Sequence, residues 1–254
     1  FGTMMRTTDG GATWTSMAGP TNISYSSAFM YNAQNIFAGR VNFYKANGRG
    51  QMEEMTRKSG GPIQSMHFTS ATDGFITKSG YVMATNDGGA SWTQLHNNYY
   101  LSELQFVSDD VAYAYGGTTF DRISRGFISK TTDGGRTWTA LDLEIRDINS
   151  AYFIDEVTGY MVDFNNVVYK TVDGAATWTE MGVIGSLYGK ATSFLYINDQ
   201  QLLASTNSGE IFKSTDAGAT WTVIHQENVP LATGQETLST QLETTVWYLR
   251  TKNF

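Results

Sequence analysis

One short sequence recurs along this chain of 254 residues, and its spacing constrains the fold more than any other feature. Residues 7–14 read TTDGGATW, and close copies lie at 85–92, 131–138, 171–178 and 214–221. Their aspartates are Asp9, Asp87, Asp133, Asp173 and Asp216, so the steps between them are 78, 46, 40 and 43 residues. A repeat of about 40 residues is typical of propellers and other folds built from one recurring unit.

The first step is two periods long, so a sixth copy is expected near residue 48. Residues 44–50 (YKANGRG) match the segment 169–174 (YKTVDG) that leads into the fourth copy. Glu53 or Glu54 stands where the tryptophan is expected. We therefore predict an eroded sixth copy of the repeat at this place.

A second shared feature lies upstream of each copy, where two short hydrophobic segments precede the box. The clearest example is 150–153 with 159–162, and 27–29, 65–68, 104–106 and 193–195 occupy the first of these two places. Each repeat then contains four strands, A to D, with the short box as the turn between strands C and D. Four strands in about 40 residues predict one propeller blade.

The two ends of the chain complement each other. Residues 1–16 contain only strands C and D, whereas 237–242 and 245–250 have the pattern of strands A and B. We predict an all-β, six-bladed β-propeller of four-stranded antiparallel sheets, closed by pairing of the N- and C-terminal strands, with seven blades as the alternative. It is one domain, residues 1–254, with blades at approximately 225–254 with 1–16, 17–55, 56–95, 96–141, 142–181 and 182–224.

Composition agrees with this fold and excludes several functions. Charged residues are only 16% of the chain, glycine is frequent and proline rare, as expected for strands joined by tight turns. The net charge of −7 argues against nucleic-acid binding, and the absence of cysteine excludes thiolate catalysis and disulfides. No apolar run reaches the ~20 residues of a membrane span. Phe1 in place of Met suggests a processed start, so any export signal would already be removed.

The boxes themselves are predicted to be structural. An aspartate followed by glycine can accept backbone N–H groups while the glycine takes a positive φ. The tryptophan then fills the apolar space between blades, with its indole N–H near the polar turn. We therefore expect no catalytic role for the box aspartates.

These boxes resemble the Asp-box, or BNR, repeat of sialidases, sortilin-type receptors, xyloglucan-cleaving glycoside hydrolases and the photosystem II assembly-factor family. The wider unit over 151–174 is most similar to the assembly-factor type, which also occurs in many exported bacterial proteins unrelated to photosynthesis. The resemblance implies a propeller, a bacterial protein and an extracellular, cell-surface or periplasmic location. It also implies that the boxes lie opposite the functional face.

The candidate site therefore lies on the B-to-C and D-to-A loops. The longest blade owes its length to an insertion at 116–125, which we expect to be an extended binding loop. The predicted binding residues are Arg40, Lys78, Asp121, Arg122, Arg125 and Arg250 from B-to-C loops, and Arg57, Tyr99 and Tyr100 from D-to-A loops. The basic side chains would attract an acidic partner. The alternatives are solvated charges without function and, for the two tyrosines, a place in the core.

We predict a non-catalytic scaffold that presents this loop face to a protein or an acidic surface, in assembly, adhesion or a surface complex. The alternative is a glycan-binding or glycan-hydrolysing propeller, in which Asp121 and Asp163 would form a pair of carboxylates ~5–10 Å apart. No cofactor is expected. The three histidines lack the spacing of metal ligands, and His67 is expected to have a structural role within a strand.

Overall fold

The computed structural model describes residues 4–19, 25–47, 49–56, 61–120, 123–143, 145–186, 189–226, 236–240 and 246–250. These residues form strands and turns and contain no helix, as the composition predicted. The chain divides into two compact units, Phe1–Ala114 with Thr131–Trp138, and Tyr115–Lys130 with Thr139–Phe254. The single domain over residues 1–254 stays a prediction.

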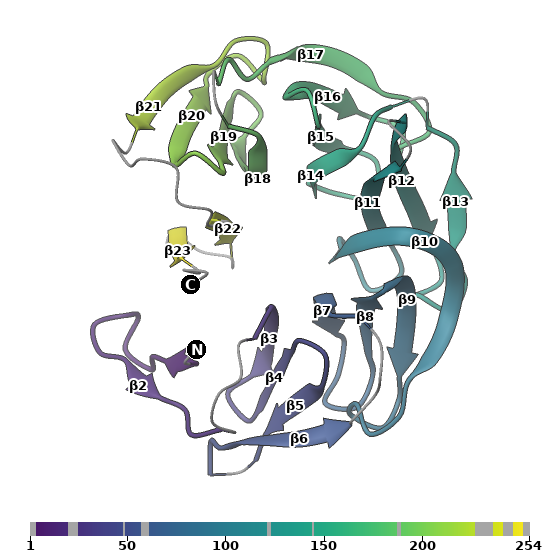
Figure 1. The fold of residues 1–254 in the computed structure, drawn as a ribbon, viewed down its shortest axis with the longest axis vertical. Helices are drawn as coiled ribbons and strands as arrows, with labels where there is room; N and C mark the ends of the chain where they lie inside the picture. The colour runs from purple at the N-terminus through teal and green to yellow at the C-terminus, as the bar shows by residue number, and fades with distance from the viewer. Residues whose placement is uncertain are drawn as a thin grey trace. The chain divides into compact units, whose positions relative to one another are not determined.

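The first unit contains one short hairpin and two sets of four consecutive strands (Figure 1). The hairpin is β1 (Met5–Arg6) with β2 (Thr15–Ser16). The first antiparallel set is β3 (Ser27–Asn32), β4 (Asn35–Gly39), β5 (Phe43–Ala46) and β6 (Met52–Thr56). The second is β7 (Ile63–Phe68), β8 (Gly74–Lys78), β9 (Gly80–Thr85) and β10 (Thr93–Phe106). Each set has the four consecutive strands that the sequence predicts for one blade.

The second unit repeats the same arrangement. One sheet is β14 (Ile148–Phe153), β15 (Gly159–Asp163), β16 (Val167–Thr171) and β17 (Thr179–Val183). The next is β18 (Ala191–Asn198), β19 (Gln201–Thr206), β20 (Glu210–Ser214) and β21 (Thr222–Gln226). In both, hydrogen-bonded neighbours are consecutive antiparallel strands, which is the A-to-D order expected of a blade.

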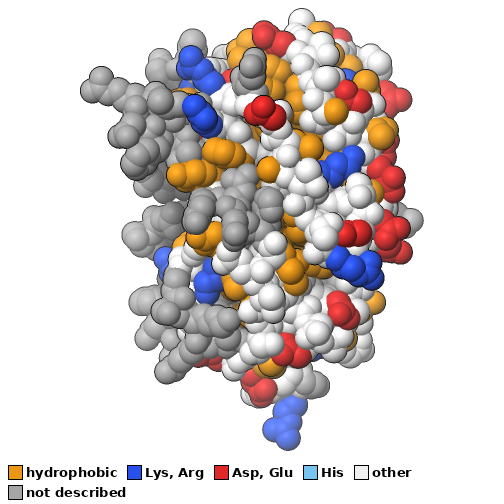
Figure 2. Space-filling view, turned by 90° about the vertical axis from the view of Figure 1, so that its right-hand side faces the viewer, with side chains coloured by type: hydrophobic (Ala, Val, Ile, Leu, Met, Phe, Trp, Pro, Cys, Tyr) orange, Lys and Arg blue, Asp and Glu red, His pale blue; other side chains and the backbone are white. Residues whose placement is uncertain are grey.

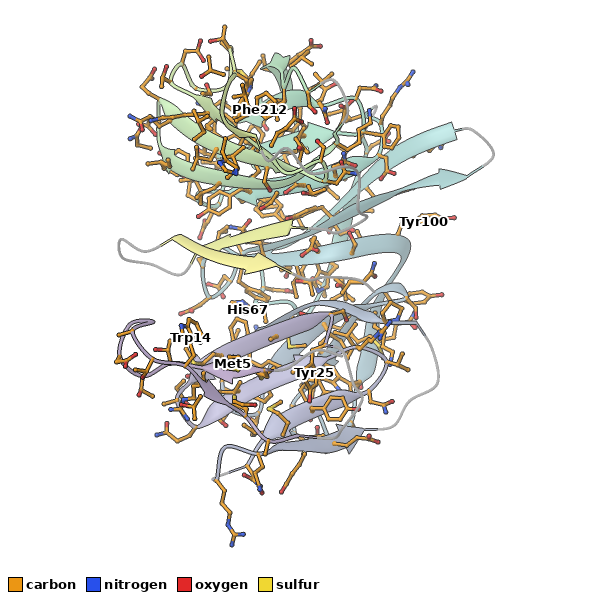
Figure 3. The ribbon with its side chains drawn as sticks, turned by 60° about the vertical axis from the view of Figure 1, so that its left-hand side comes forward. Met5, Trp14, Tyr25, His67, Tyr100 and Phe212 are labelled. Atoms are coloured by element: carbon orange, nitrogen blue, oxygen red, sulfur yellow. The ribbon has the colours of Figure 1, made fainter. Side chains whose placement is uncertain are left out.

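Two predicted loops are strands in the structure. β10 runs for 14 residues, so it serves as the fourth strand of one set and the first strand of the next, β10-β11-β12-β13. The prediction that Tyr99 and Tyr100 lie in a D-to-A loop is therefore wrong, because both residues belong to β10. The insertion at 116–125 is also no open loop, because β11 (Ala112–Phe120) and β12 (Ile123–Thr131) continue through most of it side by side (Figure 3). Tyr, Thr, Phe and Ile favour strands, which explains both extensions. β13 is Thr139–Leu141.

The terminal strands are present as predicted. β22 (Glu236–Thr240) pairs with β23 (Val246–Arg250), and β1 pairs with β2, so each half of the expected closing blade exists as an antiparallel pair. The joining of these halves, and with it the count of six blades, stays a prediction.

Hydrogen bonds within each box confirm its predicted role as a turn. The Oδ1 atom of Asp133 accepts from the Thr131 hydroxyl (2.8 Å) and the Thr137 N–H (2.9 Å), and Oδ2 accepts from the Thr137 hydroxyl (2.5 Å). Asp9, Asp87, Asp173 and Asp216 make the same three contacts. Gly134 and Gly135 have φ of 70° and 85°, a region that glycine enters at little cost.

Each of four boxes is also tied to the A-to-B turn of its own sheet. The N–H after the box aspartate donates to a carbonyl there: Gly88 to Thr72 (2.9 Å), Gly134 to Asp110 (2.9 Å), Gly174 to Val157 (2.8 Å) and Ala217 to Gln200 (3.0 Å). The A-to-B and C-to-D turns therefore lie together at one end of each of these sheets.

The predicted eroded copy forms a different turn. Asn47 takes the place of the aspartate, and its Oδ1 accepts the N–H groups of Arg49 (2.9 Å) and Gln51 (3.0 Å). β5 and β6 still pair across it, so the sixth copy is confirmed as a strand C-to-D hairpin without its tryptophan.

Aromatic side chains fill the space between neighbouring sheets. Trp92 stands edge-on against Phe43 of the preceding sheet, with ring centroids 5.1 Å apart, and Phe37 stacks on Phe68 at 3.6 Å. A Cβ atom on Gly89 would lie 2.0 Å from the Phe43 ring, so this box glycine is needed for close approach as well as for its φ of 92°. The predicted packing of the box tryptophan between blades is confirmed here.

Truncation of a buried box tryptophan should destabilise the protein strongly. Trp138 is 8% exposed and its indole N–H donates to the Gly135 carbonyl (3.0 Å). We expect Trp138→Ala to lower the free energy of unfolding by about 3–5 kcal/mol in urea denaturation. Trp14, the corresponding side chain of the first box, is 47% exposed, so Trp14→Ala should cost about 1 kcal/mol or less. Equal losses would show that burial does not govern the role of these rings.

The boxes also predict acid sensitivity. Hydrogen bonds from the threonine or serine four residues later, led by its hydroxyl, lower the pKa of each of the five box aspartates from 3.8 to about 2. A carboxyl with a depressed folded pKa stabilises the fold above pH 3.8, and this contribution is lost as the pH falls towards 2. The urea midpoint should therefore fall between pH 4 and pH 2. Asp216→Asn should show a smaller fall over this interval, and an identical fall would contradict the assignment.

Candidate functional site

The turn between β15 and β16 is organised by a buried carboxylate. Asp163 is 2% exposed, and its Oδ1 accepts the N–H groups of Asn165 (2.8 Å) and Val167 (2.9 Å). Burial raises the pKa of Asp163 above its usual value, although the two N–H groups, Arg146 and Lys190 act in the opposite direction. The carboxylate is therefore used to close its own turn.

Asn166 fixes this turn to the next sheet of the same unit. Its Nδ2 donates to the Gly189 carbonyl (2.9 Å), and its Oδ1 accepts the Ala191 N–H (2.9 Å). Asn166 has a φ of 66°, which asparagine tolerates better than most residues. Asp163 therefore closes the turn from within, and Asn166 attaches it to the next sheet.

A second buried acid lies at the same end of the next sheet. The Oε2 atom of Glu210 accepts from the hydroxyls of Thr206 (3.2 Å) and Ser208 (2.8 Å), and from Ser186 in the connection that precedes β18. Three hydroxyl donors satisfy this carboxylate where water is excluded.

Basic and aromatic side chains lie near Asp163, and of these Arg125, Arg146 and Phe164 are exposed and Lys190 is half-buried. Phe164 is 41% exposed, and the Lys190 Nζ lies 4.6 Å from the centroid of its ring. Arg146 is exposed, and its segment lies next to Phe164, since the Phe164 N–H donates to the carbonyl of the neighbouring Asp147 (2.8 Å). Arg125 is exposed near the same segment, since the Gly126 N–H donates to the Ile145 carbonyl (2.9 Å). We name Arg125, Arg146, Phe164 and Lys190 the turn surface.

Figure 2 shows one face of the molecule, on which several acidic side chains lie along the right-hand edge and basic side chains stand among hydrophobic and other groups.

In the first unit, the predicted site residues have different environments. Arg40 is exposed after β4, and Tyr100 is exposed on β10, so its predicted alternative as a core residue is wrong. Lys78 is only 8% exposed, and its Nζ donates to the Val41 carbonyl (2.7 Å) of the neighbouring sheet. Its prediction as an accessible binding cation is therefore wrong: the ammonium group ties two turns together.

The remaining predicted residues are not tested. Arg57, Asp121 and Arg122 lie outside the described residues, and Tyr99 and Arg250 are described only as parts of strands. The predicted binding residues did not include Arg146, Phe164 or Lys190. Arg146 lies in the connection between β13 and β14, so a closer reading of the D-to-A loops would have found it.

Other kinds of site find no support in the described part of the chain. It holds no group of three or more histidine, cysteine or acidic residues placed to bind a metal ion. No helix among these residues could cross a membrane. His67 stacks on Phe106 with ring centroids 4.5 Å apart, and burial lowers its pKa to about 4, which agrees with the predicted structural role (Figure 3).

Comparison with known proteins identifies the family. Residues 104–243 match the family described as photosynthesis system II assembly factor YCF48. The match covers more than half of the chain, so the protein belongs to this family. No match was found among curated proteins.

Solved structures confirm the β-propeller fold. The structure of YCF48 bound to D1 peptide is 14% identical, with a TM-score of 0.69 over 98% of this chain and 84% of that chain. YCF48 from Cyanidioschyzon merolae is 12% identical, with a TM-score of 0.62 over 85% and 77%. The GH74 xyloglucanase from Xanthomonas campestris is 13% identical, with a TM-score of 0.64 over 88% of this chain but 42% of that one. At these identities the likeness shows the fold alone.

The Asn166 contacts predict a measurable role for one side chain. Asn166→Gly keeps a residue that accepts positive φ but leaves the Gly189 carbonyl and the Ala191 N–H without this partner. We expect a loss of about 1–3 kcal/mol in the free energy of unfolding. The exposed neighbour serves as control, because Asn165→Ala should stay within about 0.5 kcal/mol. A loss no larger than this control would refute the proposed bridge between the two sheets.

Proposed function

We propose that this protein is a non-catalytic propeller scaffold that binds a protein partner through the turn surface. The observation that carries the proposal is a set of basic side chains, of which Arg125 and Arg146 are exposed, beside the exposed Phe164 ring on a turn whose own acid, Asp163, is already engaged. The role this fits is a component of an assembly, an adhesion or a surface complex. An exported location stays a prediction from the sequence.

Rigidity supports this proposal. A binding group held in place loses less conformational entropy when its partner arrives. The internal bonds of Asp163 and Asn166 hold the Phe164 turn, and the Asn207 Oδ1 accepts the N–H of Lys190 (2.9 Å). The turn surface is therefore anchored on both sheets before any partner binds.

The charges indicate the chemistry of the partner. Arg146 and Lys190 are near the Asp163 carboxylate, but that carboxylate is buried and occupied by backbone donors. The exposed parts of these cations remain available for carboxylates of an acidic segment, and Phe164 adds apolar area. Family membership and the D1 peptide bound by a YCF48 relative support a polypeptide as the class of partner.

The glycan-hydrolysing alternative gains little from the structure. Asp163, one of its two proposed carboxylates, is buried and closes a turn, so it is poorly suited to exchange a proton with a substrate. Asp121 lies outside the described residues. The GH74 relatives support this alternative only at the level of the fold.

A charge-reversal experiment tests the turn surface. The probes are the D1 peptide of the YCF48 complex and an array of acidic peptides, with the tightest binder measured by fluorescence anisotropy. Arg146→Glu should weaken binding about tenfold, or ~1.4 kcal/mol, because it replaces an attraction with a repulsion. Higher salt should weaken binding by the wild type.

Arg49→Glu is the matched control, since Arg49 is also an exposed arginine but lies on the β5–β6 turn. It should change the affinity by less than about twofold. Equal losses in the two variants would show that net charge alone governs binding and would overturn the assignment to this surface. Turnover of fluorogenic sialosides or β-glucosides by the wild type would overturn the non-catalytic part of the proposal.

A further inference from the structure

A lysine recurs at one position of strand C, and one sheet lacks it. Pairing to the preceding strand aligns Lys45 with Phe37, Lys170 with Tyr160, and Ala84 with Phe75. Pairing to the following strand agrees, because Ala84 and three of the lysines are each opposite the threonine directly after a box tryptophan. The pairs are Ala84 with Thr93, Lys130 with Thr139, Lys170 with Thr179 and Lys213 with Thr222. Ala84 therefore stands where four other repeats have lysine.

These lysines show which groups hold an ammonium at this position. The Lys45 Nζ lies 5.2 Å from the centroid of the Phe37 ring and donates to the Ala71 carbonyl (3.1 Å) in the A-to-B turn of the next sheet. The Lys130 Nζ donates to the carbonyls of Glu156 (3.1 Å) and Gly174 (3.4 Å), in the A-to-B turn and box of its next sheet. The Lys170 Nζ lies 5.3 Å from the Tyr160 ring centroid.

The same frame is present beside Ala84. The position of a Cβ atom built on the glycine after the box aspartate shows how near the turn carbonyl lies. Built on Gly134, this atom would be 3.2 Å from the Asp109 carbonyl oxygen, and built on Gly88 it would be 3.2 Å from the Ala71 carbonyl oxygen. At Gly88 the Lys45 Nζ is also 3.2 Å from this position. Phe75 supplies the aromatic ring, so the ring and the carbonyls are present without the lysine. The Arg136 Nη1 atom lies 4.0 Å from the same Cβ position on Gly134, so a guanidinium of the chain itself is next to the place that the Lys45 ammonium takes beside Gly88.

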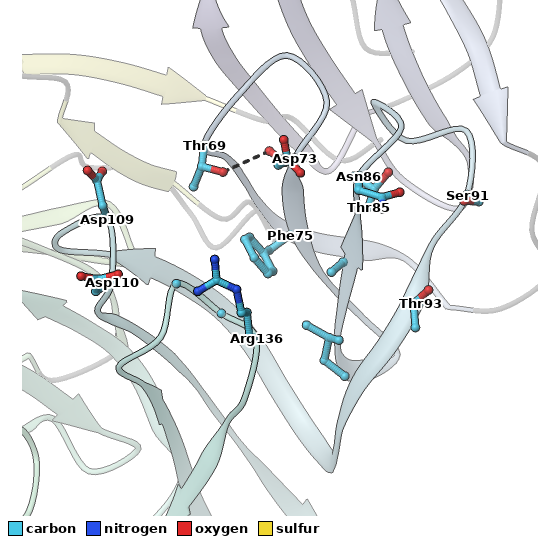
Figure 4. Close-up of a pocket in the computed structure, with 14 residues that line it drawn as sticks. Thr69, Asp73, Phe75, Thr85, Asn86, Ser91, Thr93, Asp109, Asp110 and Arg136 are labelled. Carbon is cyan, nitrogen blue, oxygen red and sulfur yellow. Dashed lines mark hydrogen bonds between the residues drawn. The ribbon is translucent and has the colours of Figure 1, made fainter.

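A pocket of about 850 Å³ lies at this position within the first unit (Figure 4). Ala84, Phe75, Asp109 and Gly134 all line it, so the pocket contains the groups that hold an ammonium in the other repeats. Pockets of this size accommodate a side chain together with its adjoining backbone.

The charges of the pocket favour a cation. Three acidic residues line it, Asp73, Asp109 and Asp110, against one arginine. The Asp73 carboxylate already accepts from the hydroxyls of Ser70 (2.6 Å) and Thr72 (2.9 Å), which leaves Asp109 and Asp110 for a further cation. The arginine is Arg136, which points into the pocket in Figure 4 and donates from Nη1 to the Asp133 carbonyl (2.9 Å) of its own box. A second cation would therefore meet an excess of acceptors.

We propose that this pocket binds the side-chain ammonium of a lysine presented by a partner polypeptide. The incoming lysine takes the place that Lys45 and Lys130 occupy in their own repeats, over the Phe75 ring and against the carbonyls of Asp109 and Gly134. This site is separate from the turn surface and goes beyond the proposed function. It also gives a binding role to the end of a sheet where the box and the A-to-B turn lie together, which the sequence did not predict.

The test uses a substitution that fills the pocket from within. A short peptide with one lysine between glycines and serines, blocked at both ends, is titrated into the whole protein, and the amide NMR shifts of residues 109–112 and 134–136 are followed. The same peptide with an acetylated lysine, which lacks the charge, should bind at least about tenfold more weakly. Ala84→Lys should weaken binding of the first peptide at least about tenfold, because its own ammonium occupies the site.

Ala176→Lys is the matched control, because Ala176 is exposed in another box at the position that Arg136 holds in its own. The Ala176→Lys variant should bind the lysine peptide as the wild type does. The midpoint of its thermal unfolding should not exceed that of Ala84→Lys. Undetectable binding by the wild type, or equal binding by Ala84→Lys, would overturn the proposal. Should Ala84→Lys fail to fold, Asp109→Asn with Asp110→Asn, both at exposed positions, must weaken binding severalfold, and unchanged binding would overturn it as well.

Discussion

The hydrogen bond from a box to the A-to-B turn of its own sheet, which four boxes make, is the contact on which the other features depend. It joins the two turns at one end of the sheet, so strands A to D are held at that end as a unit. The box can donate this bond because its aspartate and its threonine or serine satisfy the remaining N–H groups of the turn from within. With that end fixed, aromatic rings pack between sheets, and the exposed side chains of the opposite turns are available for function, while buried ones such as Asn166 and Lys78 join neighbouring sheets.

The repeat made most of this architecture predictable. Period, strand order, the eroded copy and the turn chemistry all follow from residue spacing, because each depends on local bonds that recur with the same side chains. β10 and the β11–β12 hairpin were not predictable in this way. Their residues favour strands, but whether a strand continues depends on a partner alongside it, and the spacing of boxes carries no information about that partner.

The candidate site was predictable only in outline. Basic residues after strands B and D were expected to face water, and Arg40 and Arg125 do. Lys78 is instead buried. Its ammonium group donates a hydrogen bond to the carbonyl of Val41, a residue far away in sequence. The environment of Asp163 has the same origin: its turn donors are local, but its burial depends on the neighbouring sheet. Burial of a charged side chain is a tertiary property, so the loop list alone could not separate structural charges from available ones.

The distinction between internal and available polar groups also decides where partners can bind. A buried carboxylate or amide must be satisfied within the chain, because leaving it unpaired costs about 1–3 kcal/mol, and Asp163, Asn166 and Glu210 obey this rule. Groups open to water carry no such requirement, since water replaces the missing partner. The repeat that has Ala84 in place of the lysine can therefore keep the acceptors around this position without a large penalty. These acceptors hold an ammonium in other repeats and here, among the described residues, have Arg136 as the one cation beside them, so they are a natural place for a donor from another molecule, and the other repeats already show which donor fits.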